Sequence, residues 1–136
     1  MSEHMKEAVE AYIRLFNAQD ADGIADLYAD DATVIDPMGT PPKQGREAIH
    51  TFYKLAVKNG AKLKLNGPVR VAGNCAAFPF TCSVAAMTHV DADIAVEVDI
   101  PKGGMTIDII DTFTFNEDGK VTEMNAYWGP TNITQV

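Results

Sequence analysis

Basic residues are scarce in this chain. Lysine and arginine together number 11, against 19 aspartates and glutamates, which gives a net charge of −8 at pH 7 and a pI of about 4.7. Nucleic acids and anionic membrane surfaces attract proteins through clustered cations. The composition therefore argues against both as partners and favours a neutral or cationic small molecule as ligand.

Cysteine and histidine are also sparse. The 2 cysteines, Cys75 and Cys82, would point to opposite faces of one extended strand and lie about 20 Å apart, too far to form a disulfide. Reduced thiols in a cytoplasmic protein are the simple interpretation. His4, His50 and His89 are scattered and the chain has no CxxC motif, so no metal site is predicted.

Long hydrophobic runs are missing as well. The longest apolar stretch, residues 75–87, is too short to cross a bilayer and contains Pro79. The first ten residues are charged and lack the apolar run of a secretory signal. No repeat or linker divides the 136 residues, so we predict one domain, residues 1–136, with no membrane association.

What the chain does contain is helical periodicity in its first half and strand periodicity in its second. Apolar residues recur every three or four positions over the predicted helices, which span residues 5–16, 20–28 and 45–58. After a short extended segment, residues 32–36, and a turn at Pro37, alternating patterns separated by glycine-containing turns predict strands over residues 61–71, 76–87, 94–100, 105–115 and 120–128. Helices followed by adjacent strands are typical of an α+β fold, whose curved sheet can enclose an apolar pocket against the helices.

Asp111 interrupts an otherwise apolar strand face. Along residues 105–115, Ile107, Ile109, Phe113 and Phe115 share a face with it. A carboxylate buried there would lose its hydration without compensation, so it must be paired, metal-bound or protonated. The sequence offers no basic residue close by to pair it, and a protonated acid can donate a hydrogen bond. The ordinary alternative is a polar spot where the strand meets water.

Tyr12 and Asp36 are two further polar groups on apolar surfaces. Tyr12 lies within the apolar stripe of the first helix, where its hydroxyl needs a buried partner, although many such tyrosines only reach the rim of a core. Asp36 ends a short strand before Pro37, where an aspartate commonly forms the turn. Alternatively, its carboxylate projects into the mouth of a cavity.

Together these three residues suggest a reaction. A neutral acid at Asp111 and the phenol of Tyr12 can both donate to one oxygen and stabilise negative charge that develops there. Asp36, if ionised, can remove a proton next to that carbonyl. This is enolisation, which needs no cofactor, and aromatic residues such as Phe80 and Trp128 would suit an apolar ketone.

The chain resembles the bacterial Δ5-3-ketosteroid isomerases, within the cone-shaped nuclear transport factor 2-like (SnoaL-like) superfamily. The resemblance includes a Tyr-Ala-Asp-Asp-Ala-Thr run followed by Asp-Pro, and it places Tyr12, Asp36 and Asp111 in register. The segments that carry it are residues 11–13, 27–39, 52–53, 79–80, 110–115 and 126–128. It implies about three helices on a curved, mixed, mostly antiparallel sheet that encloses an apolar pocket.

The resemblance also implies roles for individual residues. Asp36 matches the general base that moves a proton from C4 to C6 of the steroid, and Tyr12 and Asp111 match donors to the C3 oxygen of the dienolate. This enzyme family is itself the known example of a carboxylic acid held neutral by an apolar site. The supporting or substrate-binding positions are Tyr28, Tyr53, Phe80, Phe113 and Trp128.

One departure from the family lies in residues 88–104, where this chain is longer. The alternation of Ile94, Val96, Val98 and Ile100 predicts an added or extended hairpin. Such a hairpin would overhang the cavity mouth or extend a subunit contact, and so affect which substrates fit.

We therefore expect a steroid Δ5–Δ4 isomerase that acts on an apolar ketone. The alternatives are another enzyme of the superfamily, such as a polyketide cyclase or a dehydratase, and a non-catalytic module for small-molecule binding or protein association. The family also implies a homodimer through the sheet face, on which Ile110 would lie.

Overall fold

The computed structural model describes residues 2–85 and 104–135. The helices are α1 (Ser2–Asn17), α2 (Ala21–Ala25), α3 (Arg46–Lys58) and the short 3-10 helix η1 (Pro130–Asn132). The strands are β1 (Tyr28–Ile35), β2 (Lys43–Gln44), β3 (Lys62–Leu65), β4 (Arg70–Ala72), β5 (Cys75–Val84), β6 (Met105–Phe115), β7 (Val121–Tyr127) and β8 (Ile133–Gln135). No helix in these two ranges is long and apolar enough to span a membrane.

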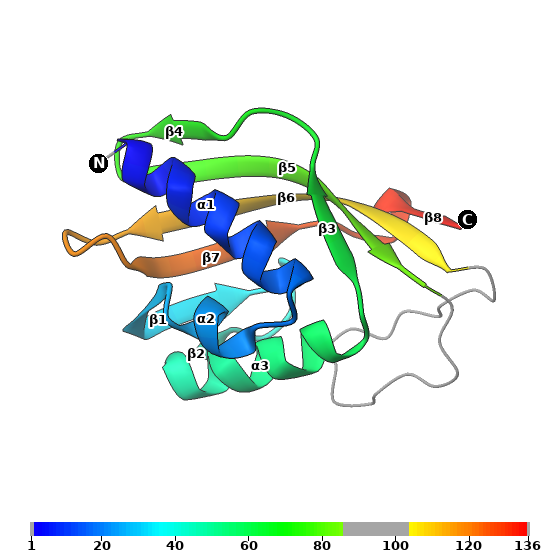
Figure 1. Cartoon of the computed structure of the whole chain (residues 1–136), viewed down its shortest axis with the longest axis horizontal. Coiled ribbons are helices and arrows are strands. Elements are labelled where there is room, and N and C mark those ends of the chain that lie inside the picture. Colours follow the sequence, from blue (N-terminus) through cyan, green and yellow to red (C-terminus); the bar gives the residue numbers. More distant parts are fainter. Residues whose placement is uncertain (1, 86–103, 136) are drawn as a thin grey trace.

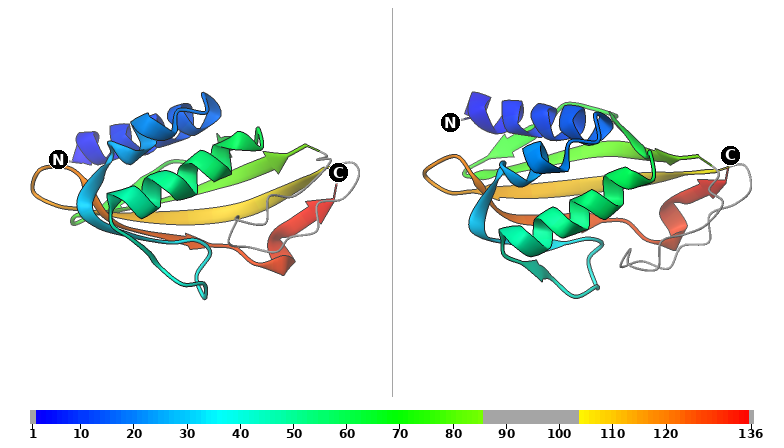
Figure 2. Two further views of the ribbon diagram at one scale, coloured as in Figure 1. Left: turned by 90° about the horizontal axis from the view of Figure 1, so that it is seen from below. Right: turned by 60° about the horizontal axis from the view of Figure 1, so that its bottom comes forward.

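The strands form one curved, mixed sheet with the helices packed on one of its faces (Figures 1 and 2). The strand order is β2-β1-β7-β6-β5-β3, with β4 added beside β5 and β8 beside β6. Strands β1 and β7 run parallel, and the other pairs are antiparallel. The predicted α+β class, with helices on a mixed and mostly antiparallel sheet, is confirmed.

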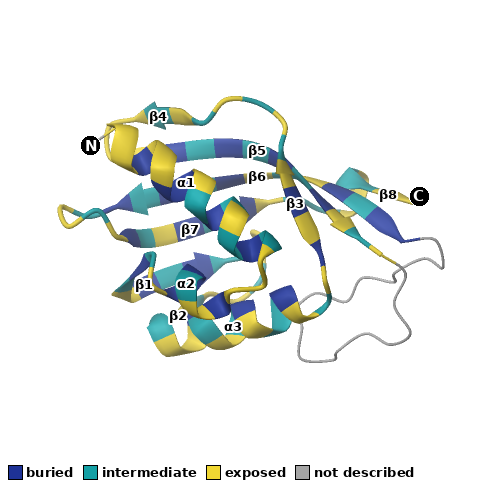
Figure 3. Ribbon diagram, in the orientation of Figure 1, coloured by how far each residue is buried: buried dark blue, intermediate teal, exposed yellow. Residues whose placement is uncertain are grey.

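The helices form because their apolar residues face the sheet. Met5, Val9, Tyr12 and Phe16 of α1 are all buried, at the spacing of one helical face. Buried and exposed residues accordingly alternate around the helices and along the strands in Figure 3. Asp20 caps α2 by accepting a hydrogen bond from the backbone N–H of Gly23 at 2.9 Å.

Strand β6 runs through the centre of the sheet and has the predicted bounds. Its inward residues alternate with outward ones, as expected for a strand with one buried face. Asp111 lies opposite Phe78 of β5 on one side and Ala126 of β7 on the other. The register therefore fixes the acid on the face that α1 covers.

Two of the predicted elements differ in extent from those of the structure. The helix predicted over residues 20–28 ends at Ala25, and Tyr28 instead begins β1. The reason is pairing with β7: the backbone N–H of Val121 donates to the carbonyl oxygen of Leu27 at 2.9 Å, and Tyr28 pairs with Val121. The strand predicted over residues 61–71 is divided into β3 and β4 by a turn.

The short strands β2 and β8 were not predicted. The expected strand over residues 94–100 lies outside the described residues, as does the longer segment 88–104 apart from Gly104. The two cysteines are free thiols, with Cys75 exposed and Cys82 buried, as their spacing predicts.

Candidate active site

Asp111 is buried without a complete set of partners. Its side chain is 1% exposed, and its Oδ1 atom has no hydrogen-bond partner among residues 2–85 and 104–135. Burial, and then the negative charge of Asp36, hold the pKa of Asp111 well above its usual range. The acid therefore favours its protonated form, in which the hydroxyl is a hydrogen-bond donor. The expectation of a buried acid on an apolar strand face is confirmed.

Three buried tyrosines form a chain of hydrogen bonds beside this acid. The hydroxyl of Tyr53 on α3 donates to the hydroxyl of Tyr12 on α1 at 3.2 Å, and the hydroxyls of Tyr28 and Tyr53 are 2.7 Å apart. A phenol has one proton to donate. Since Tyr53 gives its proton to Tyr12, Tyr28 must donate to Tyr53. The proton of Tyr12 is then left for another acceptor.

The three phenols stay protonated across the neutral range. Burial is the largest cause that raises the pKa of each one well above its usual value. The ring of Tyr12 is held edge-on by Phe113, with the ring centroids 5.3 Å apart and the planes at 88°. This packing fixes the direction in which the Tyr12 hydroxyl points.

Asp36 occupies a different environment at the end of β1. It has intermediate exposure and begins a turn, and its bond to Pro37 is a cis peptide. The indole N–H of Trp128, just after β7, donates to Asp36 Oδ1 at 2.9 Å. Burial raises the pKa of Asp36, while the Trp128 hydrogen bond and the positive charge of Lys43 lower it.

The three polar groups predicted from sequence face one interior region. Asp111 and Asp36 both raise the pKa of Tyr12, and Asp36 raises the pKa of Asp111. Because the effect of a charge falls off with distance, the three groups lie within electrostatic reach of one another. The structure thus brings together one acid that favours the neutral form, one phenol with a free proton, and a second carboxyl group.

The predicted aromatic residues surround this cluster. Phe113 is fully buried between Tyr12 and Phe78, with ring centroids 5.3 and 5.0 Å away. Phe80 is 3% exposed and stacks on Phe78 at 5.7 Å. Trp128 donates a hydrogen bond to Asp36. The surroundings of the cluster are therefore apolar and aromatic.

Sequence reasoning missed two residues of this region. Phe78 was signalled, since it precedes Phe80 by two positions on the same face of β5. Lys43 carried no signal, because β2 has only two residues and shows no periodicity. Its ammonium group lies 4.7 Å from the ring centroid of Phe52 and has no hydrogen-bond partner among the described residues.

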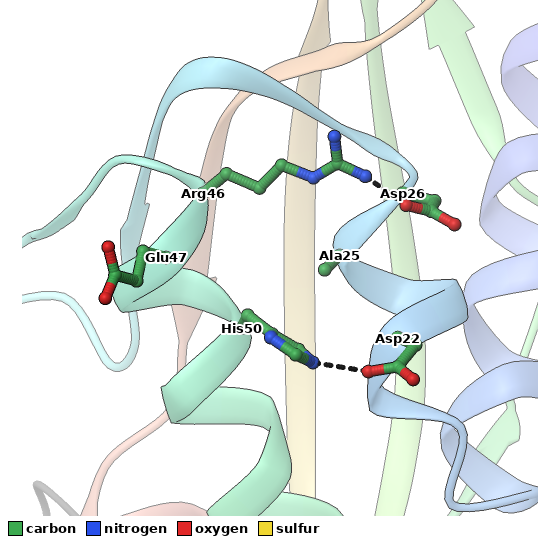
Figure 4. A pocket seen from close by; sticks show the side chains of 6 residues that line it. All are labelled: Asp22, Ala25, Asp26, Arg46, Glu47 and His50. Carbon is green, nitrogen blue, oxygen red and sulfur yellow. Dashed lines mark hydrogen bonds and ion pairs between the residues drawn. The ribbon is translucent and has the colours of Figure 1, made fainter.

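No group of three or more His, Cys, Asp and Glu side chains in residues 2–85 and 104–135 could hold a metal ion. An open surface pocket of about 430 Å³ lies between α2 and α3, away from the cluster (Figure 4). Its polar groups already pair with one another, as Asp26 with Arg46 and Asp22 with His50.

The fold and the sequence both have known relatives. The chain is 34% identical over 130 residues to a steroid Delta-isomerase from Nocardioides simplex, covering 96% of this chain and 94% of that one. It is 27% identical over 128 residues to the epoxide hydrolase LasB of Streptomyces lasalocidi, covering 93% of this chain and 42% of that one. It spans less than half of LasB.

The structure is also similar to that of SalBIII, described as an epoxide hydrolase/cyclase-like enzyme in pyran ring formation in polyether salinomycin. The TM-score is 0.83 at 24% identity, covering 99% of this chain and 98% of that one, which shows a shared fold. The relatives named by sequence and by structure are thus enzymes. A family model for the SnoaL-like domain matches residues 9–124, and the chain therefore belongs to the SnoaL-like family.

Proposed function

We propose that this protein is a cofactor-independent isomerase that converts an apolar 3-oxo-Δ5-steroid into its Δ4 isomer. Asp36 is the base in this proposal: its carboxylate takes a proton from C4, and the electrons of that C–H bond move into a dienolate. The proton then returns from Asp36 to C6, so the enzyme ends unchanged and the double bond has moved.

Tyr12 and Asp111 are the oxyanion donors in this scheme. As C4 loses its proton, negative charge develops on the C3 oxygen. Two donors that point at this oxygen in a site with little water stabilise the charge more than the neutral ketone, which lowers the barrier. Neither donor needs to be ionised, and the raised pKa values of both keep their protons available at neutral pH.

The observation that carries the proposal is the pair of unused donors. The proton of Tyr12 is not used within the tyrosine chain, and the Asp111 carboxyl group has a buried oxygen with no partner in the part of the chain that the structure describes. Leaving a buried polar group unsatisfied costs about 1–3 kcal/mol. A module that only bound an apolar molecule would gain nothing from this cost. Much tighter binding of a phenolate ligand such as equilenin than of a neutral steroid would support the role of Tyr12 and Asp111 as oxyanion donors.

A second candidate reaction is the opening of an epoxide, because two of the relatives are named as epoxide hydrolase or epoxide hydrolase/cyclase-like enzymes. The same constellation supports it, since protonated Asp111 could donate to the epoxide oxygen while Asp36 accepts the proton of an attacking hydroxyl group. Cleavage of the C–O bond would then leave a neutral alcohol.

The deciding experiment compares two substrates with one set of variants. Androst-5-ene-3,17-dione gives a conjugated enone that absorbs in the ultraviolet, so isomerisation can be followed directly. We expect turnover by the wild type and a loss of about 10²–10⁴-fold in Asp36→Asn. Asp26→Asn, on the surface between α2 and α3, is the matched control and should keep full activity.

Two outcomes would overturn the assignment. Undiminished turnover in Asp36→Asn would show that Asp36 is not the base. A wild type that does not isomerise the steroid but opens an apolar hydroxy-epoxide would favour the second candidate.

We further propose a homodimer formed through the outer face of the sheet. Ile110 and Tyr127 lie opposite each other on β6 and β7 and are 50% and 48% exposed. Sedimentation of the wild type beside Ile110→Lys tests this, since a buried charge should shift the protein to a monomer. A monomeric wild type would refute it.

A further inference from the structure

Lys43 has a buried charge that no described residue pairs directly. The residue as a whole has intermediate exposure, but its Nζ atom is buried and lacks a hydrogen-bond partner among the residues that the structure describes. It rests over the face of Phe52, 4.7 Å from the ring centroid. A cation–π contact of this kind recovers only part of the hydration that a buried ammonium group loses. Lys43 is therefore held in this position at a cost.

The sheet places Lys43 beside the proposed base. Strand β2 pairs with β1 so that Lys43 lies opposite Val34, two residues before Asp36. None of the ion pairs within 4.0 Å in the described residues joins Lys43 to Asp36. The ammonium charge nonetheless acts on the carboxyl group of Asp36 through space.

Among the described residues, the other groups that interact with Asp36 are ones whose charged form burial disfavours, or that do not ionise. They come from α1, β1, β5, β6 and the segment after β7, and they are Tyr12, Tyr28, Cys82, Asp111 and Trp128. Burial raises the pKa of both tyrosines and of Asp111, and it raises the pKa of Cys82 to about 12. From α3, the neighbour of Lys43 is the uncharged ring of Phe52. Lys43 is thus the cation among these groups.

We propose that Lys43 is a positioning residue whose ammonium group keeps Asp36 ionised from a distance, without forming an ion pair. A direct ion pair would pin the carboxylate and make it a poor proton acceptor. A cation beyond contact distance favours the ionised form and leaves the carboxylate oxygens free to approach the substrate. The inference rests on the proposed role of Asp36 as base, but the effect on its ionisation can be measured in the ligand-free protein.

The test follows the titration of the Asp36 carboxyl carbon by NMR in protein labelled with ¹³C-aspartate. Asp36→Asn identifies the signal. We expect Lys43→Met to raise the midpoint by about one pH unit, a tenfold gain in proton affinity. Lys43→Arg should restore the midpoint to near the wild-type value. Lys64→Met, on the exposed edge of β3, changes the net charge equally and should leave the midpoint in place.

The pH profile of kcat/KM for isomerisation gives a second readout. Its acidic limb should move upward in Lys43→Met by the same amount as the NMR midpoint, with the rate recovered at higher pH. An inactive wild type would refute the proposed function, while the NMR titration would still decide the role of Lys43. If Lys43→Met does not fold, Lys43→Gln provides the same loss of charge.

Two results would overturn the inference. One is an unchanged Asp36 midpoint in the variant without charge. The other is an equal shift in Lys43→Met and Lys43→Arg, which would mean that the shape of the lysine, and not its charge, sets the midpoint.

Discussion

The two carboxyl groups of the site, Asp111 and Asp36, are chemically identical but lie in different surroundings. Asp111 lies in the middle of the central strand, 1% exposed, among aromatic rings and phenols. Asp36 lies at the end of a strand with intermediate exposure, where an indole N–H and a nearby ammonium group both favour its ionised form. The negative charge of Asp36 also disfavours ionisation of Asp111, since it raises the pKa of Asp111.

This difference shows how one residue type can serve both as a hydrogen-bond donor and as a base. Burial raises the pKa of both acids, but at Asp36 the hydrogen bond from Trp128 and the charge of Lys43 offset part of this rise. One acid is then left as a proton donor in a hydrogen bond and the other as a proton acceptor. Pairs of titratable groups whose environments drive their pKa values apart are typical of acid–base catalysis.

Among the variants that keep Asp36 in place, the largest effect is expected from removing the neutral acid. Asp111→Leu replaces an unsatisfied polar group by an apolar one, so the free energy of unfolding should rise by about 1–3 kcal/mol. Isomerase activity should fall by about 100- to 1000-fold, because one of two oxyanion donors is gone. Urea unfolding and the enone absorbance assay measure the two quantities. A variant that is less stable and fully active would refute the assigned role of Asp111.

The next largest effect is expected in the pH dependence of stability, which reports the protonation state of Asp111. Because the folded protein binds the Asp111 proton more tightly than the unfolded chain does, unfolding releases this proton above pH 3.8. The stabilisation is complete below that pH and declines by about 1.4 kcal/mol per pH unit until the folded pKa is reached. Asp111→Asn cannot release a proton, so its stability relative to the wild type should improve as pH rises from about 4.

Urea titrations of both proteins at several pH values between 4.5 and 8 check this. Asp26→Asn, on the surface, provides the control, and it should show no such trend. A constant difference between Asp111→Asn and the wild type would mean that Asp111 is already ionised in the folded protein.

The sequence predicted those parts of the fold whose patterns are long. Helix α3 and strand β6 were located to within one residue, because each carries several turns or alternations of a single period. The end of α2 was placed wrongly, since the spacing of Ile24, Leu27 and Tyr28 fits one face of a helix. Pairing of Tyr28 with Val121, far away in sequence, decides the matter. No local pattern contains that contact.

The candidate site was predictable to a similar extent. The alternation along β6 was enough to predict that Asp111 is buried, and the apolar stripe of α1 was enough to predict that Tyr12 is buried. The order of donors in the tyrosine chain was not predictable, because it depends on how α1, α3 and β1 meet. Lys43 was missed for the same reason: its position follows from pairing between two short segments.

A smaller effect is expected from shortening the tyrosine chain. Tyr53→Phe removes the bond donated to Tyr12, which should cost about 0.5–1.5 kcal/mol of transition-state stabilisation, or roughly 2- to 10-fold in kcat. Tyr28→Phe acts one bond further away and should cost less. Steady-state kinetics of both variants measure this order. A larger loss in Tyr28→Phe would show that the chain donates in the opposite direction.

The smallest effect belongs to the surface between α2 and α3, where charged groups meet in water. Arg46 pairs there with Asp26, and the two side chains are 39% and 70% exposed. Exposed ion pairs contribute about 0.2–1 kcal/mol, since water and salt screen the attraction. A double-mutant cycle of Arg46→Met and Asp26→Asn in urea should therefore give a coupling in this range that shrinks at high salt, with activity unchanged. A coupling as large as the effect of Asp111→Leu, or one that salt does not weaken, would mean that this surface is less hydrated than its exposure indicates. In that case, water would not screen charges at the surface much better than in the interior. Differences in hydration would then no longer explain why Asp111 and Asp36 favour different protonation states.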